Sequence, residues 1–380
     1  MDVTVDQLVR RSAVLKRELV AFARQGRPGR ELSEAVTARF GNPVVSTDEE
    51  LTNFVDQFVL QVRLSDGRTV LERFVRSRGE LPRAERDMLR GWGDPVEGMF
   101  EVEALDGETL VCTNVIDELP YRIRSNMGAQ LFRDRLPPGT LLLVRVVPVL
   151  DEWLISGMSI IFTPAQRDAA LVAAYEVARK SPALVFRNPA KLEFGRRLQA
   201  EDRAAFVAHF GDDQVVVPGA ELVERWAAFW RYRHGDGAAP RADLSGPAEG
   251  STVGLIYDER HGLGFYKEFG ALAELFAHPE LIDDPLRAEV LEDYLYDTEA
   301  SGVPLVRCVQ RYPEGADALL AKVLRRPRFR WARDGEEVLR RFKPGFLDEP
   351  LPQVLQISDL LADAVRRSAD ASVVTDEILR

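Results

Sequence analysis

The spacing of apolar residues changes near Val96, and this change limits the chain to a mixed helix-and-strand fold. Before that point, apolar residues recur every three or four positions, as they do on one face of a helix. From Val96 to Phe162 they recur every second position, and Asp106-Gly107 is a strong hairpin signal. We therefore predict five short antiparallel strands that close into a small β-barrel, because closure removes exposed strand edges.

The fold class that follows is α+β, with several parts in a chain of 380 residues. Residues 235–250 are rich in Gly, Pro and small polar residues, which is typical of a linker. The predicted parts are a helical N-terminal region (1–93), the five-stranded barrel (94–163), a helical segment (164–234), the linker (235–250) and a smaller α+β C-terminal domain (251–380).

Helix starts are marked by a hydroxyl residue followed three positions later by Glu or Gln. Thr69 with Glu72 and Thr163 with Gln166 have this capping-box pattern, and Ser46 or Thr47 can cap a third helix. Beyond the linker we predict a strand over Val253–Tyr257 and a helix over Phe265–Phe276.

The composition bears on partners and location. The formal net charge of −11 repels phosphates and anionic lipids at long range, although a local basic patch can still bind nucleic acid. No apolar run is long enough to span a membrane, and the acidic N-terminal residues contain no apolar signal core. We expect a cytoplasmic protein with no membrane partner.

The two cysteines, Cys112 and Cys308, are far apart and belong to no CxxC grouping, so a thiolate zinc site within the chain is not expected. Both lie in apolar, strand-like segments, where buried and unreactive thiols are common.

Several segments of the first half resemble a group of uncharacterised bacterial proteins, in which helices precede a small β-barrel. The segments that carry the resemblance are 53–58, 66–74, 81–86, 99–102, 138–143 and 153–157. The resemblance covers roughly residues 50–162 and implies a fold but no activity and no catalytic residues. Some members end in an SEC-C zinc module, whose Cys/His-rich tail this chain lacks.

Known catalytic and nucleotide-binding motifs are missing from the sequence. There is no GxxxxGK[ST], no HExxH and no GxSxG, and the glycines at 262, 264 and 270 do not have dinucleotide-binding spacing. The sequence does not identify a cofactor, and it leaves open whether the protein is an enzyme.

One polar cluster is a candidate metal site. Asp258, His261 and His278 lie within a short stretch that also contains Glu259 and Glu280. These side chains can bind a divalent cation, and a metal of this kind can support a hydrolase-like reaction. The alternative is a charged turn in which an imidazole pairs with a carboxylate.

One basic strip is a candidate nucleic-acid site. Its cations alternate with aromatic residues, a composition that suits phosphate contacts combined with base stacking. The candidate residues are Arg325, Arg326, Arg328, Arg330 and Trp331. The alternative is a strand that buries Phe329 and Trp331 in the core and leaves the arginines in solvent.

Taken together, these patterns favour a non-enzymatic binding or accessory module with a protein or nucleic-acid partner. The alternative is a metal-dependent, hydrolase-like enzyme that uses the polar group between Asp258 and Glu280.

Overall fold

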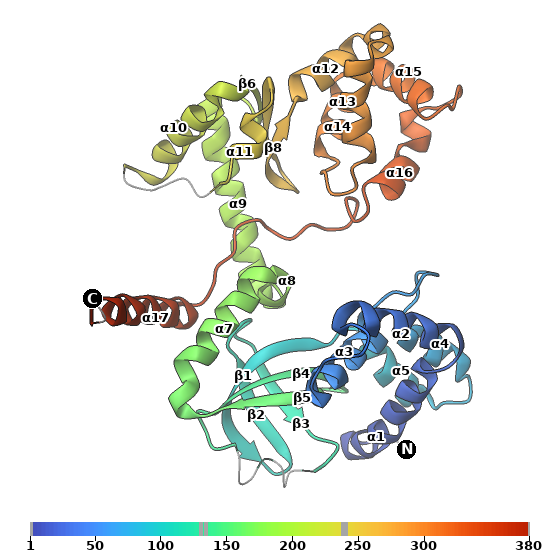
Figure 1. The fold of residues 1–380 in the computed structure, drawn as a ribbon, viewed down its shortest axis with the longest axis vertical. Coiled ribbons are helices and arrows are strands. Elements are labelled where there is room, and N and C mark those ends of the chain that lie inside the picture. The colour runs from blue at the N-terminus through green and yellow to red at the C-terminus, as the bar shows by residue number, and fades with distance from the viewer. Residues whose placement is uncertain (1–2, 129–131, 133–135, 237–241, 379–380) are drawn as a thin grey trace. The chain divides into compact units, whose positions relative to one another are not determined.

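The computed structural model describes residues 3–128, 132, 136–236 and 242–378, and it contains both helices and strands. The chain forms two compact units (Figure 1). The first comprises Met1–Asn188 together with Gln356–Arg380, and the second comprises Pro189–Leu355. The fold class is therefore α+β, as the change in residue spacing predicts.

The first unit begins with helices that its sequence caps locally. Thr47 and Thr69 both form the predicted capping box, with Glu50 and Glu72 respectively. The helices are α1 (Val5–Ala23), α2 (Gly26–Phe40), α3 (Asp48–Gln61), α4 (Val70–Ser77) and α5 (Arg83–Gly91).

The predicted five strands follow these helices. They are β1 (Val96–Asp106), β2 (Thr109–Asn114), β3 (Pro120–Arg124), β4 (Leu141–Val149) and β5 (Glu152–Phe162). They pair in the order β1-β2-β3-β5-β4, and β4 pairs with β1, so the sheet closes on itself.

The prediction of an antiparallel sheet is wrong at one pairing, because β3 and β5 run parallel through Ile123–Trp153 and Arg124–Leu154. The reason is geometric. Strand direction alternates around an antiparallel sheet, and a closed ring with an odd number of strands must contain one pair that runs in the same direction.

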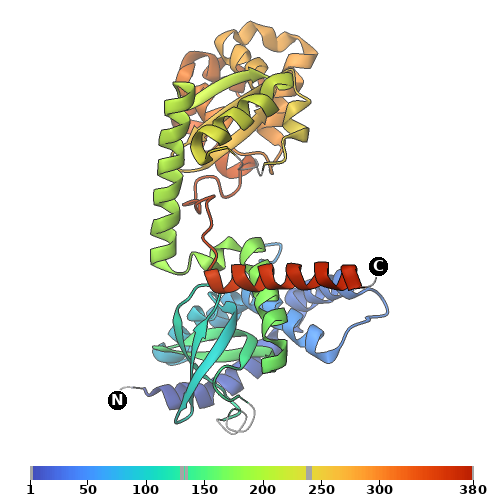
Figure 2. The same cartoon turned by 90° about the vertical axis from the view of Figure 1, so that its left-hand side faces the viewer.

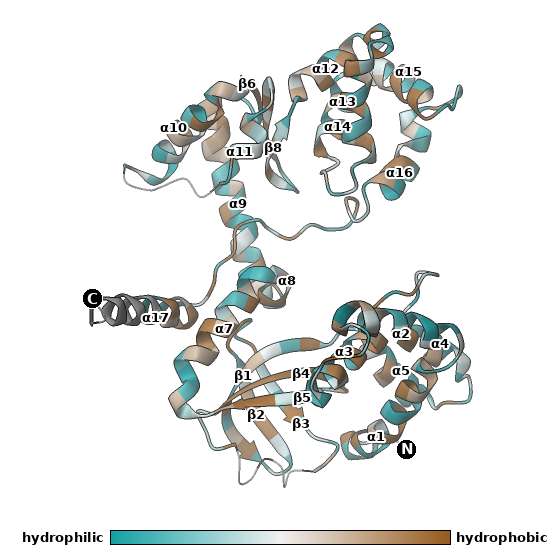
Figure 3. Ribbon diagram, in the orientation of Figure 1, coloured by the Kyte–Doolittle hydropathy of each residue, from teal (hydrophilic) through white to brown (hydrophobic). Residues whose placement is uncertain are grey.

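Strand β4 lies between two hydrophobic cores. Leu142, Val144 and Val146 belong to the core inside the closed sheet, whereas Val147 and Val149 pack among the N-terminal helices. A strand buried on both faces needs apolar residues at nearly every position, which explains the long apolar run of β4 (Figure 3).

Among the described residues, the first unit also contains helices that follow β5. Helices α7 (Arg167–Lys180) and α8 (Pro182–Val185) follow the short 3₁₀ turn Pro164–Gln166, which Thr163 caps as predicted. The C-terminal helix α17 (Asp359–Ile378) packs against α7 (Figure 2). An ion pair between Arg367 and Asp168, at 2.8 Å, joins the two helices.

The second unit combines a three-stranded sheet with a group of helices. Its sheet has the order β6 (Gln214–Pro218), β7 (Thr252–Asp258) and β8 (Gly262–Lys267). Its helices are α9 (Pro189–Phe210), α10 (Leu222–His234), α11 (Ser245–Ala248), α12 (Phe269–Ala277), α13 (Pro285–Tyr296), α14 (Val303–Arg311), α15 (Pro313–Val323) and α16 (Trp331–Phe342), with 3₁₀ turns at Gly219–Glu221 and Pro279–Asp283.

The predicted strand over Val253–Tyr257 is confirmed as β7, but the predicted helix over Phe265–Phe276 is wrong in its first part. Residues 262–267 form β8, and α12 begins only at Phe269. The backbone of β8 pairs with β7 along its whole length, so a partner strand decided a conformation that the local pattern left ambiguous. Cys308 likewise lies in helix α14 and not in a strand.

The predicted linker falls inside the second unit. Residues 237–241 lie outside the described part of the chain, and Ser245–Ala248 form α11. Strand β6 precedes the linker and β7 follows it, yet the two strands pair with each other. The division between the units instead lies next to Pro189 and next to Leu355.

Among the helices of the described residues, none combines the length and the apolar character needed to cross a membrane.

Candidate functional site

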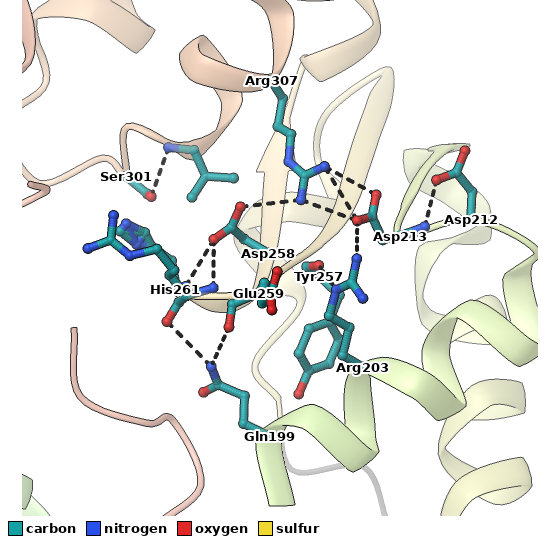
Figure 4. Close-up of polar contacts among 12 residues, drawn as sticks. Gln199, Arg203, Asp212, Asp213, Tyr257, Asp258, Glu259, His261, Ser301 and Arg307 are labelled. Carbon is teal, nitrogen blue, oxygen red and sulfur yellow. Dashed lines mark hydrogen bonds and ion pairs between the residues drawn. The ribbon is translucent and has the colours of Figure 1, made fainter. Parts of the chain in front are cut away.

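The predicted polar cluster around Asp258 forms an ion-pair network in the second unit (Figure 4). Arg307 on α14 bridges Asp213 and Asp258, with 3.2 Å from its guanidinium nitrogens to each carboxylate. Arg203 on α9 lies 2.5 Å from Asp213 and also donates to the Tyr257 carbonyl. Two arginines therefore balance two aspartates, and the network joins α9, α14 and the ends of β6 and β7.

Asp258 is fully engaged in this network. Its Oδ1 atom accepts hydrogen bonds from the backbone N–H groups of Arg260 and His261, at 3.0 and 3.1 Å. Partial burial raises the pKa of Asp258, but these two hydrogen bonds and nearby positive charge outweigh burial and hold the pKa below its usual value. The carboxylate serves as a structural anchor for the turn between β7 and β8.

The predicted metal ligands are not brought together. The His261 ring stacks against Phe346 at 4.3 Å between centroids, and His278 pairs with Glu280 at 3.5 Å. Within the described part of the chain, no three His, Cys, Asp or Glu side chains gather in a way that can hold a metal ion. The set Asp258, His261 and His278 is thus not assembled, and the alternative of a charged turn describes Asp258 better.

The basic strip is also engaged internally. Arg326 lies 2.7 Å from Glu337, and Arg330 lies 3.5 Å from Asp317. Phe329 is buried, and Trp331 packs against the same core at the start of α16. The predicted strand is therefore wrong, although the prediction that these aromatic rings face the core holds. Arg325 and Arg328 are exposed, but the rings needed for base stacking are not.

The first unit contains a cavity that the sequence did not indicate. It has a volume of about 480 Å³ and lies between α1, the strands β4 and β5, and the segment after β3. We call it the α1–β5 cavity. It is lined by Ser12, Lys16, Trp92, Ser125, Asn126, Met127, Phe132, Leu136, Leu142, Val147, Leu154, Ile155, Ser156, Gly157, Met158, Ser159 and Ile161.

Lys16 is the one charged residue among those lining residues, and it belongs to a buried polar network. Its Nζ atom donates to Ser156 Oγ at 2.8 Å and forms an ion pair with Asp56. Asp56 also forms an ion pair with Arg145, at 3.1 Å, and Arg145 forms a second ion pair with Glu97, at 2.9 Å. The network therefore joins α1, α3, β4 and β5 around one end of the cavity.

The charged side chains of this network have little contact with solvent. The side chains of Asp56 and Arg145 are 3% and 7% exposed, whereas Lys16 is 22% exposed. Burial lowers the pKa of Lys16 below its usual value, and the adjacent Asp56 carboxylate opposes that shift. A lysine is retained in a poorly solvated position here because a carboxylate and a hydroxyl accept its hydrogen bonds.

Trp92, another lining residue of the cavity, lies close to Lys16. Trp92 is buried, and its indole N–H has no hydrogen-bond partner among the described residues. The Lys16 ammonium lies 5.5 Å from the centre of the Trp92 ring. This nitrogen has almost no accessible surface, so it is a buried donor that the fold leaves unsatisfied.

Gly157 positions β5 against α3 beside this network. Its backbone has φ = +79°, and a Cβ atom there would lie 2.6 Å from Asn53 Oδ1. That oxygen accepts a hydrogen bond of 2.7 Å from the Met158 N–H. Glycine is therefore required both by the backbone conformation and by the close approach of Asn53.

Sequence reasoning did not select Lys16, Asp56, Arg145 or Ser156 as site residues. They come from four elements, and no local spacing connects them. A partial signal was present, since segments 53–58 and 153–157, on which the resemblance rests, supply Asn53, Asp56, Ser156 and Gly157 to this region. We found no family model, no curated protein and no solved structure that matches the chain, so the resemblance itself stays an expectation.

Proposed function

We propose that the first unit is a binding module for a small, largely apolar molecule that carries one acidic or carbonyl group. The observation that carries the proposal is the α1–β5 cavity, whose largely apolar lining contains a single charged group, the Lys16 ammonium. Apolar pockets with a few converging polar groups are the usual form of small-molecule sites, and about 480 Å³ is within their normal range.

The charge of the buried network supports an acceptor group on the ligand. Two cations, Lys16 and Arg145, face one buried carboxylate, Asp56. Glu97 completes the balance from a position where its side chain is 55% exposed. An oxyanion or carbonyl oxygen beside Lys16 meets a poorly solvated cation, and hydrogen bonds to a charged group are strong.

This proposal keeps the binding-module class inferred from the sequence and changes the partner. The proposed partner is a small molecule, because the α1–β5 cavity has a volume of about 480 Å³ and a largely apolar lining. The metal-dependent hydrolase is not carried forward, because Asp258 is engaged in the Arg307–Asp213–Asp258 network, while His261 lies against Phe346 and His278 pairs with Glu280.

Two fluorescent probes with the same ring system test the proposal. Anilinonaphthalene sulfonate carries a sulfonate, and N-phenyl-1-naphthylamine lacks it. We expect both to bind the wild-type protein saturably, with the sulfonate probe about tenfold tighter because of its charge-assisted hydrogen bonds. Lys16→Met removes the cation, and we expect it to abolish that preference.

A matched pair of variants locates the binding site. Ile160 and Ile161 are adjacent on β5 and similarly exposed, at 49% and 40%, but only Ile161 lines the cavity. Ile161→Trp should weaken both probes by about tenfold or more through loss of contact volume, and Ile160→Trp should leave binding unchanged. Equal effects of the two variants, with native circular dichroism retained, would place the probes elsewhere and refute the proposal.

A further inference from the structure

A second hollow in the first unit lies between α3, α4 and α5 and has a different chemical character. Its volume is about 710 Å³, and it shares no lining residue with the α1–β5 cavity. We call it the arginine hollow. It is lined by Leu60, Gln61, Arg63, Thr69, Leu71, Glu72, Val75, Arg76, Gly79, Arg86, Arg90 and Gly93.

Four of these residues are arginines and only one, Glu72, is acidic. Two arginines are held in place: Arg63 donates to the Gly67 carbonyl at 2.7 Å, and Arg90 lies 3.1 Å from Asp87. The side chains of Arg76 and Arg86 have no hydrogen bond or ion pair with any other described residue. The hollow therefore has a surplus of positive charge in a chain whose net charge is −11.

From this arrangement we infer that the arginine hollow binds the phosphate groups of a small phosphorylated molecule. A guanidinium presents paired N–H donors in a fixed plane, which match two oxygens of a phosphate. Arg76 and Arg86 keep those donors free, whereas Arg63 and Arg90 already lie 3.8 and 3.1 Å from Glu72 and Asp87.

The hollow favours a compact ligand over a nucleic-acid polymer. A polymer places many phosphates along the protein surface, where the net negative charge of the chain repels them. A di- or triphosphate concentrates its charge within the hollow.

Calorimetric titration with inorganic pyrophosphate tests the inference on the full chain. We expect saturable binding that weakens as salt screens the charges. Arg76→Gln combined with Arg86→Gln should weaken binding by about tenfold to a hundredfold, because two charge-assisted contacts are lost. Arg83→Gln is the matched control: Arg83 also lies on α5, but it is 91% exposed, pairs with Asp87 and does not line the hollow.

A variant that should bind more tightly shows that weaker binding by the arginine variants is not simply a loss of folding. Glu72 is the one acid among the lining residues, and it also completes the capping box of α4 with Thr69. Glu72→Gln keeps a side-chain acceptor for the Thr69 N–H, since Gln is equally suited to this position, and removes the negative charge. We expect pyrophosphate to bind this variant several-fold more tightly.

Three outcomes overturn the inference. The first is the absence of pyrophosphate binding to the wild-type protein at low salt. The second is equal affinity of the wild-type protein and the Arg76→Gln, Arg86→Gln variant. The third is a short DNA duplex that binds through the same arginines more tightly than pyrophosphate does, which would make the hollow part of a nucleic-acid surface.

Discussion

Lys16 on α1 donates a hydrogen bond of 2.8 Å to Ser156 on β5, although 140 positions separate the two residues. Both residues also contact Asp56 on α3, so one carboxylate joins two helices and a strand of the closed sheet. The contact orders the wall of the α1–β5 cavity and leaves Lys16 as its charged group. Stability of the first unit and the chemistry of its cavity therefore depend on the same few residues.

Removing the shared carboxylate should be severely destabilising. Asp56→Ala leaves Lys16 and Arg145 as buried cations without their partner, and loss of one member of a buried pair typically costs about 3–5 kcal/mol of unfolding free energy. Glu49→Ala, at an exposed position of the same helix, should change the stability by less than about 0.5 kcal/mol. Urea denaturation of both variants measures the two losses of unfolding free energy. A loss for Asp56→Ala as small as that for Glu49→Ala would show that the network contributes little to stability.

The stability of the protein should depend on Lys16 at alkaline pH. Burial lowers the pKa of folded Lys16 below its usual value of 10.5, so just below that value the unfolded chain binds more protons at this residue than the folded chain. The free energy of unfolding therefore rises with pH through this window, and the rise is complete above pH 10.5.

Urea denaturation of the wild-type protein and of Lys16→Met across the alkaline range measures this effect. The stability of the wild-type protein relative to Lys16→Met should increase as the pH rises, whereas Lys180→Met, at an exposed position, should run parallel to the wild type. Parallel curves for Lys16→Met would mean that the Asp56 carboxylate fully compensates for burial.

Gly157→Ala should destabilise the first unit more than Gly107→Ala does. Both glycines have positive φ, at +79° and +64°, so each substitution strains the backbone by about 1–2 kcal/mol. A Cβ atom at 107 meets nothing within 4 Å, but one at 157 would lie 2.6 Å from Asn53 Oδ1. Thermal unfolding of the two variants isolates the effect of the contact with Asn53. Equal losses of stability would show that α3 moves away from the added Cβ atom at no cost in free energy.

Both cysteines should resist thiol reagents in the folded protein. Cys112 and Cys308 are buried, and burial raises the pKa of each thiol to about 12. The reactive thiolate is therefore scarce at pH 8, and access to the sulfur is blocked. Reaction with an aromatic disulfide reagent should be negligible under native conditions and should release two equivalents in denaturant. Rapid native labelling of either residue would reveal local opening around it.

Features that depend on neighbours in the chain could be predicted from the sequence. The capping boxes of Thr69 and Thr163 form within four residues, and the five strands of the first unit follow from alternation between adjacent positions.

Features that depend on pairing between distant segments could not be predicted from the sequence. Strand β8 reads locally as the start of a helix and becomes a strand because β7 supplies a partner. The parallel pairing of β3 with β5 follows from ring closure and not from any property of either strand. The apolar segment around Cys308 suits a strand or a buried helix equally well, and packing within the second unit selects the helix.

The candidate site shows the same division most clearly. The sequence alone determined the α+β class, the helix caps, the five strands of the first unit and the burial of both thiols, because propensity and spacing act over a few residues. Only the tertiary structure decided that Lys16, Asp56, Arg145 and Ser156 meet, and that Arg63, Arg76, Arg86 and Arg90 share one hollow. A charged side chain acquires its chemical role from the groups that exclude water around it, and the packing of distant segments determines which groups those are.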